Sequence, residues 1–317
     1  MRKTHKIVLG VVLGCVLLVV GGELFARFYL GLGDPMLWMD EPTIEYMFQP
    51  NQRGRQLGNQ YLYNEYSMRS ETMSASRTDP DELRILFFGD SVLNGGHMTD
   101  QACLATEIIK GDLETRLQRP VAVGNISAGS WGPKNCLEYA KKFGLFGADV
   151  VVLVVSSHDY ADNPAYLPLA GTSAIYPARR PPCALYEAVT RYLPMYLPRG
   201  APRENAPEDT VDEKSIAVAM DATRELVQMA LSAKARVIPV QHLAMEEVKN
   251  GPQQGHAVFG ELWHELDLAS VQLGPAFADA LKRGDNPYRD VIHPNALGQR
   301  IIADQLIEAI CESLQRL

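Results

Sequence analysis

A short apolar run at residues 83–88 ends abruptly at Gly89-Asp90-Ser91, and this junction constrains the fold more than any other stretch. The run contains isoleucine and two phenylalanines and is stopped by a glycine, which is typical of a buried β-strand. Ligands of parallel α/β sheets bind beyond the carboxyl ends of the strands. A serine in a tight turn there exposes its hydroxyl while its backbone is held rigid. Because the tripeptide also occurs by chance, a plain strand-to-loop junction is the alternative interpretation.

A second stretch, far downstream, supplies the groups that a serine nucleophile needs. Asp290 and His293 are separated by two residues, and Pro294, which suits the first position of a helix, follows them directly. The carboxylate can orient the imidazole while the imidazole faces a serine from elsewhere in the fold. This pattern predicts a nucleophile, Ser91, with His293 as its base and Asp290 as the orienting acid.

Strand and helix patterns alternate from residue 102 onward. Apolar runs predict strands at residues 121–123, 150–155, 236–240 and, more weakly, 271–273; helical periodicity is found at 102–117, 135–146 and 211–235. The run at 150–155 is continuously apolar, as in a strand that is covered on both faces. The alternation therefore predicts a parallel, doubly wound sheet.

The junction at residues 89–91 and the pattern Asp290-x-x-His293-Pro resemble the first and last blocks of the SGNH (GDSL) hydrolase superfamily. The resemblance covers residues 83–317. It implies a flavodoxin-like, three-layer α/β/α fold in which the serine is the nucleophile and the aspartate and histidine complete a catalytic triad.

Two middle blocks of the family supply donors to the oxyanion hole. The family glycine of the second block falls at Gly129 or Ser130, and either backbone amide can act as the donor. The third block, Gly-x-Asn-Asp in the family, reads Ser-Ser-His-Asp at residues 156–159, so His158 replaces the asparagine. A neutral imidazole can donate one hydrogen bond, whereas loss of a donor costs about 3–4 kcal/mol of transition-state stabilisation. The resemblance implies an oxyanion hole formed by the amides of Ser91 and of Gly129 or Ser130, with His158 as a third donor.

The front of the chain predicts a membrane anchor. A basic tail at residues 1–6 precedes an unbroken apolar run at 7–22, which would span roughly 24 Å as a helix. Glu23 follows with no cleavage site nearby, which favours an uncleaved signal anchor at residues 7–30 over a removed signal peptide. The positive-inside rule then places the tail in the cytoplasm and the catalytic domain outside, in the periplasm if the source is bacterial.

Two further segments interrupt the expected α/β pattern. Residues 31–82 are polar and aromatic without a clear period, and we expect a spacer that packs partly against the domain edge. Residues 163–210 form an insertion rich in proline, tyrosine and arginine. One interpretation is a cap over the site, with Tyr166 stacking on sugar rings and Arg179 meeting carboxylates; the other is a variable surface loop. Trp131 and His242 are further candidate substrate contacts, with core packing as the alternative for Trp131.

Composition excludes several functions. The formal net charge of -8 argues against a nucleic-acid partner, which needs a basic face. The sequence contains no glycine-rich phosphate loop and no clustered metal ligands, so no cofactor and no metal are expected. The five cysteines have no metal-type spacing, and free thiols are favoured over disulfides.

The predicted chemistry is acyl transfer through an acyl-serine intermediate. For an outward-facing anchored enzyme, analogy with the family favours removal of acetyl groups from a cell-surface or exported polysaccharide. The partners would be an acylated carbohydrate substrate, the membrane and exopolysaccharide synthesis proteins. A polysaccharide O-acetyltransferase and a non-catalytic polysaccharide-binding or scaffold protein are the alternatives. The sequence leaves open the acyl group, the glycan and the oligomeric state.

Overall fold

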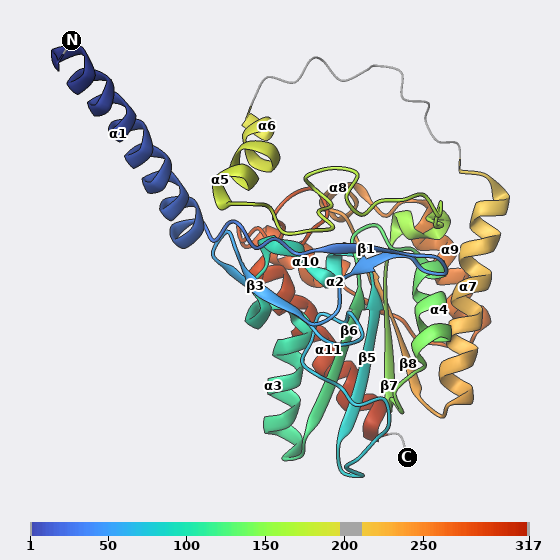
Figure 1. Cartoon of the computed structure of the whole chain (residues 1–317). Helices are drawn as coiled ribbons and strands as arrows, with labels where there is room; N and C mark the ends of the chain where they lie inside the picture. Colours follow the sequence, from blue (N-terminus) through green and yellow to red (C-terminus); the bar gives the residue numbers. More distant parts are fainter. Residues whose placement is uncertain (1, 197–210, 316–317) are drawn as a thin grey trace.

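The computed structural model describes residues 2–196 and 211–315, so the last part of the predicted insertion, 197–210, lies outside the described residues (Figure 1). A parallel five-stranded sheet forms the centre of the domain, in the order β6-β5-β7-β8-β9. Its strands are β5 (Leu83–Gly89), β6 (Val121–Ser127), β7 (Val150–Ser156), β8 (Arg236–His242) and β9 (Val271–Gln272). The first strand of the sheet therefore lies second in space, which is the flavodoxin-like order with its switch point beside β5.

Helices cover both faces of this sheet, as the alternating pattern predicts. One face is covered by α3 (Ala105–Leu117), α10 (Gly274–Lys282) and α11 (Ala296–Gln315), and the other by α4 (Pro133–Phe143), α7 (Glu213–Ser232) and α9 (Gln254–Glu265) (Figure 1). Alternate residues of β5 enter different cores: Ile85 and Phe87 join the first, and Leu86 and Phe88 join the second. A strand buried on both sides must be continuously apolar, and the three-layer α/β/α fold is thereby confirmed.

The predicted spacer is instead a folded part of the domain. It forms two antiparallel hairpins, one from β1 (Trp38–Glu41) and β2 (Glu45–Phe48), the other from β3 (Gln52–Gln56) and β4 (Asn59–Tyr63). Their aromatic side chains are buried in the same core as α4 and α7; they include Trp38, Tyr46, Phe48 and Tyr63. The strands are too short, and their turns too close together, for a clear period to be visible in the sequence.

The N-terminal helix α1 (Arg2–Leu24) projects from the domain and ends in a π-helical turn, Phe25–Tyr29 (Figure 1). The segment Thr4–Tyr29 has a mean hydropathy of 2.6, and its most apolar stretch is not buried in the domain. Such a helix is long and apolar enough to cross a membrane, and a signal sequence has the same properties.

The described part of the insertion packs against the front of the chain. Tyr176 meets Trp38 edge-on with ring centroids 5.4 Å apart. The insertion then forms α5 (Ala184–Glu187), a π-helical turn (Ala188–Tyr192) and α6 (Leu193–Tyr196). The backbone amides of Ala184 and Leu185 donate to the carboxylate of Glu23 at the end of α1, at 3.1 and 2.9 Å. This region therefore joins the base of the N-terminal helix to the domain.

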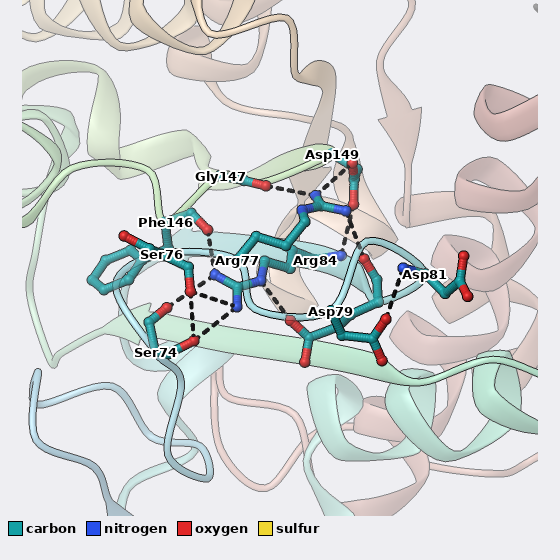
Figure 2. A network of polar contacts seen from close by, with 10 residues as sticks. Ser74, Ser76, Arg77, Asp79, Asp81, Arg84, Phe146, Gly147 and Asp149 are labelled. Atoms are coloured by element: carbon teal, nitrogen blue, oxygen red, sulfur yellow. Dashed lines mark hydrogen bonds and ion pairs between the residues drawn. The ribbon is translucent and has the colours of Figure 1, made fainter.

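A buried arginine network ties loops together at the amino end of the sheet (Figure 2). Arg84, near the start of β5, donates to the carbonyl oxygens of Ser74 at 2.9 Å and Phe146 at 2.7 Å. Arg77 pairs with Asp149 at 2.7 Å, and the same carboxylate accepts from the backbone amide of Arg84 at 2.9 Å. All five cysteines are free in the structure, and Cys136 alone among them is buried.

Candidate active site

The serine turn consists of Gly89, which ends β5, and the two residues that follow it. A side chain on Gly89 would lie 3.1 Å from the carbonyl oxygen of Val154 on the neighbouring strand β7, so the close approach of the strands favours glycine. Asp90 caps the short helix α2 (Ser91–Asn94), because its Oδ1 accepts from the amide of Val92 at 2.8 Å. Ser91 is thereby fixed at the first helical position, at the carboxyl edge of the sheet.

The histidine lies on the loop that precedes α11. Its carbonyl oxygen accepts from the amide of Arg289 at 2.8 Å. Asn295 caps the helix, and its Oδ1 accepts from the amides of Leu297 and Gly298 at 2.9 and 3.1 Å. The helix consequently begins at Ala296. Pro294 was predicted at the first helical position, and it lies two residues before the helix instead.

The structure brings together the three residues predicted from far-apart blocks. The Oγ of Ser91 lies 2.9 Å from Nε2 of His293. The Nδ1 of His293 lies 2.9 Å from Oδ1 and 2.8 Å from Oδ2 of Asp290. In the tautomer with a proton on Nδ1, His293 donates to Asp290 and its Nε2 is free to accept the serine proton.

The environment of Asp290 keeps its carboxylate ionised. Partial burial alone would raise the pKa of Asp290, but hydrogen bonds from the amides of His293 and Ile292, together with the imidazole, outweigh it. The net effect is a lowered pKa. A carboxylate held in this way can fix the imidazole tautomer and stabilise an imidazolium that forms transiently.

The second block lies beside the serine turn. Gly89 at the end of β5 pairs in register with Ser127 at the end of β6, so the turn with Gly129 and Ser130 is at the same sheet edge as Ser91. Tyr46 of the front hairpin donates its hydroxyl to the carbonyl oxygen of Gly129 at 2.7 Å and faces that of Ser130 at 3.2 Å. Burial raises the pKa of Tyr46, so the phenol remains a donor. This role has no signal in the sequence, because nothing in a polar lead-in links a tyrosine to a distant turn.

The third block places His158 against two buried carboxyl groups. Its Nε2 lies 3.1 Å from Oδ1 of Asp159 and 3.7 Å from Oδ2 of Asp90. Burial raises the pKa of both carboxyl groups, and Asp90 raises that of Asp159 further. Nε2 of His158 makes no hydrogen bond to either of these oxygens, and the role of His158 as a third oxyanion donor remains a prediction.

Two predicted substrate contacts are core residues instead. Trp131 is 3% exposed, and its Nε1 donates to the carbonyl oxygen of Tyr46 at 3.0 Å. His242 is 1% exposed, and its Nε2 lies 2.9 Å from the carbonyl oxygen of Ile292, directly before His293. A buried side chain cannot stack on a soluble sugar, so both predictions are wrong. Both residues help to hold site loops.

The burial of His242 also controls its charge. Loss of hydration lowers its pKa to about 4, with further lowering by His158 and His293, while the Ile292 carbonyl and Glu247 act in the opposite direction.

Glu247 is itself 5% exposed and accepts from Ser157 Oγ and from the backbone amide of Gln253. Its carboxylate therefore joins α8 (Met245–Asn250) to the turn that carries His158.

Tyr166 and Arg179, predicted as contacts from the insertion, are exposed and lie along the front hairpins. The amide of Tyr166 donates to Glu45 at 3.1 Å. Within the described residues, Tyr192 of the insertion approaches the loop that follows α2, where its ring lies edge-on to His97 with centroids 6.5 Å apart. The cap interpretation for Tyr166 and Arg179 remains a prediction.

Arg69 is a further support of the site that has no signal in the sequence. This side chain is fully buried, and its guanidinium donates to the carbonyl oxygens of Asn94, Gly96 and Thr99, at 2.7 Å for the last. These carbonyls belong to the loop that follows Ser91. Arg69 of the front segment thus stabilises the loop next to the nucleophile.

Comparisons with known proteins find similar solved structures but no matching family. No protein-family model matches the chain, and no curated protein matches it in sequence. Similar solved structures include a member of the lipolytic protein G-D-S-L family from Veillonella parvula (14% identity, 74% of this chain and 100% of that chain, TM-score 0.46). A lipase/acylhydrolase from Enterococcus faecalis shows 15% identity over 72% of this chain and 95% of that chain, with a TM-score of 0.44. The acetylxylan esterase Axe2 from Geobacillus stearothermophilus, as a catalytic mutant, shows 14% identity over 73% and 94%, with a TM-score of 0.46.

Proposed function

We propose that the protein is an SGNH-type serine ester hydrolase that acts through an acyl-serine intermediate. The observation that carries this proposal is the unbroken hydrogen-bonded chain from Asp290 through His293 to Ser91, with contacts of 2.8 to 2.9 Å. Nucleophile, base and orienting acid are each within direct reach of the next, and the serine hydroxyl is at the open edge of the sheet.

The geometry assigns a role to each group. His293 takes the proton from Ser91 as its Oγ bonds to the ester carbonyl carbon. The same imidazole then gives the proton to the leaving alkoxide, and the alcohol departs. Water, deprotonated by His293, attacks the acyl-serine, and the carboxylic acid leaves as the proton returns to Ser91. Asp290 holds the imidazole in place, and the amides of Ser91 and of Gly129 or Ser130 meet the oxyanion.

The substrate we propose is an acetylated carbohydrate on a cell-surface or exported polysaccharide. The side chains of His293 and Asp290 are partly exposed, so a large polymeric alcohol can extend beyond the reacting ester. The protein we propose is anchored in a membrane with its N-terminus inside and its catalytic domain in the periplasm or another extracytoplasmic space. The apolar segment Thr4–Tyr29 supports the anchor, and the basic residues before it favour this orientation. Proteins of exopolysaccharide synthesis are the proposed partners at that location.

The test is hydrolysis of p-nitrophenyl acetate by the full chain purified in detergent, together with labelling by a fluorophosphonate. Ser91→Ala and His293→Ala should each reduce kcat/KM by roughly three or more orders of magnitude. Ser232→Ala and His264→Ala change the same residue types on exposed helical positions and should retain wild-type rates.

The two readouts separate the alternatives. Labelling of Ser91 without turnover would favour a selective acyltransferase, and donor and acceptor sugars would then be supplied together. If wild type neither reacts with the label nor exceeds Ser91→Ala in rate, the hydrolase proposal is wrong and a binding role follows.

A further inference from the structure

Two buried carboxylates at the carboxyl edge of the sheet each have one oxygen without a hydrogen bond. Asp90 and Asp159 are 1% and 2% exposed. Oδ1 of Asp90 accepts from the amide of Val92 at 2.8 Å, and Oδ2 of Asp159 accepts from the amide of Ser156 at 2.7 Å. In the described part of the chain, the second oxygen of each carboxylate has no hydrogen-bond donor. Leaving such atoms bare is costly, so they indicate a missing positive partner.

Both orphan oxygens lie near the same nitrogen. Nε2 of His158 is 3.1 Å from Oδ1 of Asp159 and 3.7 Å from Oδ2 of Asp90, and the three atoms lie within 4.8 Å of one another. Although the first separation is short, it lacks the angle of a hydrogen bond, since the Asp159 oxygen remains unsatisfied. The imidazole is therefore not placed as a simple donor to either carboxylate.

The spacing fits ligands around one cation. Ligand atoms at about 2.0–2.1 Å from a tetrahedral zinc ion are roughly 3.3–3.4 Å from one another. The two separations from His158 fall on either side of that value. Calcium and magnesium prefer shells made of oxygen atoms, and magnesium completes its shell with several waters, so the imidazole nitrogen is what favours a transition-metal ion here.

We propose that Asp90, His158 and Asp159 form a binding site for a divalent transition-metal cation, with Zn²⁺ as the best match to the donor set. One imidazole nitrogen and two carboxylate oxygens are ordinary zinc ligands, and three protein ligands leave a fourth position for water or substrate. The side chain of His158 is 46% exposed, so the fourth position can be reached from solvent.

This inference deepens the proposed function and rests on it. Asp90 directly precedes Ser91, so the cation lies beside the nucleophile. Its charge can polarise an ester carbonyl oxygen at the fourth position. It would thereby replace the side-chain donor that the third sequence block lacks.

The experiment uses the full chain in detergent, stripped with EDTA and then titrated with ZnCl₂ by calorimetry and with Co²⁺ by visible absorption. We expect one equivalent of metal to bind. His158→Asn should weaken binding by at least about 100-fold, because it removes a direct ligand. His264→Asn makes the same change at an exposed helical position and should bind as wild type does. Because His158 is partly exposed, its replacement should leave the fold intact, and an unchanged melting temperature would verify this.

Fluorophosphonate labelling of Ser91 and p-nitrophenyl acetate hydrolysis are measured on the same samples. Failure of wild type to bind Zn²⁺, or binding by His158→Asn at unchanged affinity, overturns the metal site even if Ser91 reacts normally. Tight, His158-dependent binding establishes the site. If hydrolysis is then insensitive to Ser91→Ala, the proposed function fails while the metal site stands.

Discussion

Replacing Arg69 by methionine should loosen the turn that carries the nucleophile. The guanidinium of Arg69 is 0% exposed and donates to three backbone carbonyls, those of Asn94, Gly96 and Thr99. Methionine fills much of the same space but donates nothing. Each hydrogen bond to a charged group contributes about 1.5–3 kcal/mol, and the contributions of neighbouring bonds are not additive. The desolvation that lowers the pKa of Arg69 is relieved in the variant and offsets part of the loss. We therefore expect a net destabilisation of about 3 kcal/mol.

Thermal unfolding of the full chain in detergent, followed by tryptophan fluorescence, measures this effect. At about 2–4 °C for each kcal/mol, Arg69→Met should melt roughly 6–12 °C below wild type. Arg53→Met replaces an exposed arginine on β3, and its melting temperature should equal that of wild type. Arg69→Lys should lie between the two, because one ammonium group retains the charge but cannot span all three carbonyls.

The catalytic readout distinguishes positioning from mere stability. Since the carbonyls belong to the loop after Ser91, Arg69→Met assayed well below its melting temperature should lower kcat more than it raises KM. Arg69→Lys should recover part of kcat. Equal melting temperatures for Arg69→Met and Arg53→Met would refute the reasoning, because the buried guanidinium would then contribute no more than an exposed one.

Three further perturbations follow from the site and its supports. Asp290→Asn should lower kcat by about 10³–10⁴-fold, because the wrong imidazole tautomer is held; a steady-state assay that shows less than tenfold would contradict this. The pKa of His242 is about 4 in the folded state and about 6.5 unfolded, so the unfolded state binds the proton first and stability falls by up to about 3 kcal/mol as pH drops from 6.5 to 4. Denaturant unfolding across that range should show a shallower decline for His242→Gln. In α9, a Cβ on Gly255 would lie 1.7 Å from the Ser157 carbonyl, whereas Gly260 has nothing within 4 Å, so Gly255→Ala should destabilise and Gly260→Ala should stabilise by up to about 1 kcal/mol. Equal melting temperatures for the two would exclude the clash.

The sequence was sufficient for the sheet and for the three central residues of the site. Continuous apolar strands such as β7 must be covered on both faces, and this requirement alone favours parallel strands between helix layers. Parallel strands end at a common edge, which explains how Ser91 and the loop with Asp290 and His293 come together across a long stretch of chain.

The supports of the site could not be predicted in the same way. Arg69 binds backbone carbonyls, which carry no side-chain signal in the sequence. Trp131 lies shortly after β6 and His242 is the last residue of β8, both at the ligand edge. Neighbouring segments bury them, and only tertiary packing decides between a pocket wall and a core. In the sequence, Glu247 resembles a residue on a solvated helix face. Its carboxylate is nevertheless buried and accepts a hydrogen bond from Ser157.

The two ends of the sheet differ in how well their polar groups are satisfied. At the amino end, Arg84 is buried with carbonyl and carboxylate partners around its guanidinium (Figure 2). At the carboxyl end, Asp90 and Asp159 keep bare oxygens beside the serine turn. Folding alone favours the first arrangement, since a bare buried carboxylate oxygen costs free energy. The two bare oxygens next to Ser91 are thus a physical reason, independent of any sequence resemblance, to place the chemistry at the carboxyl edge.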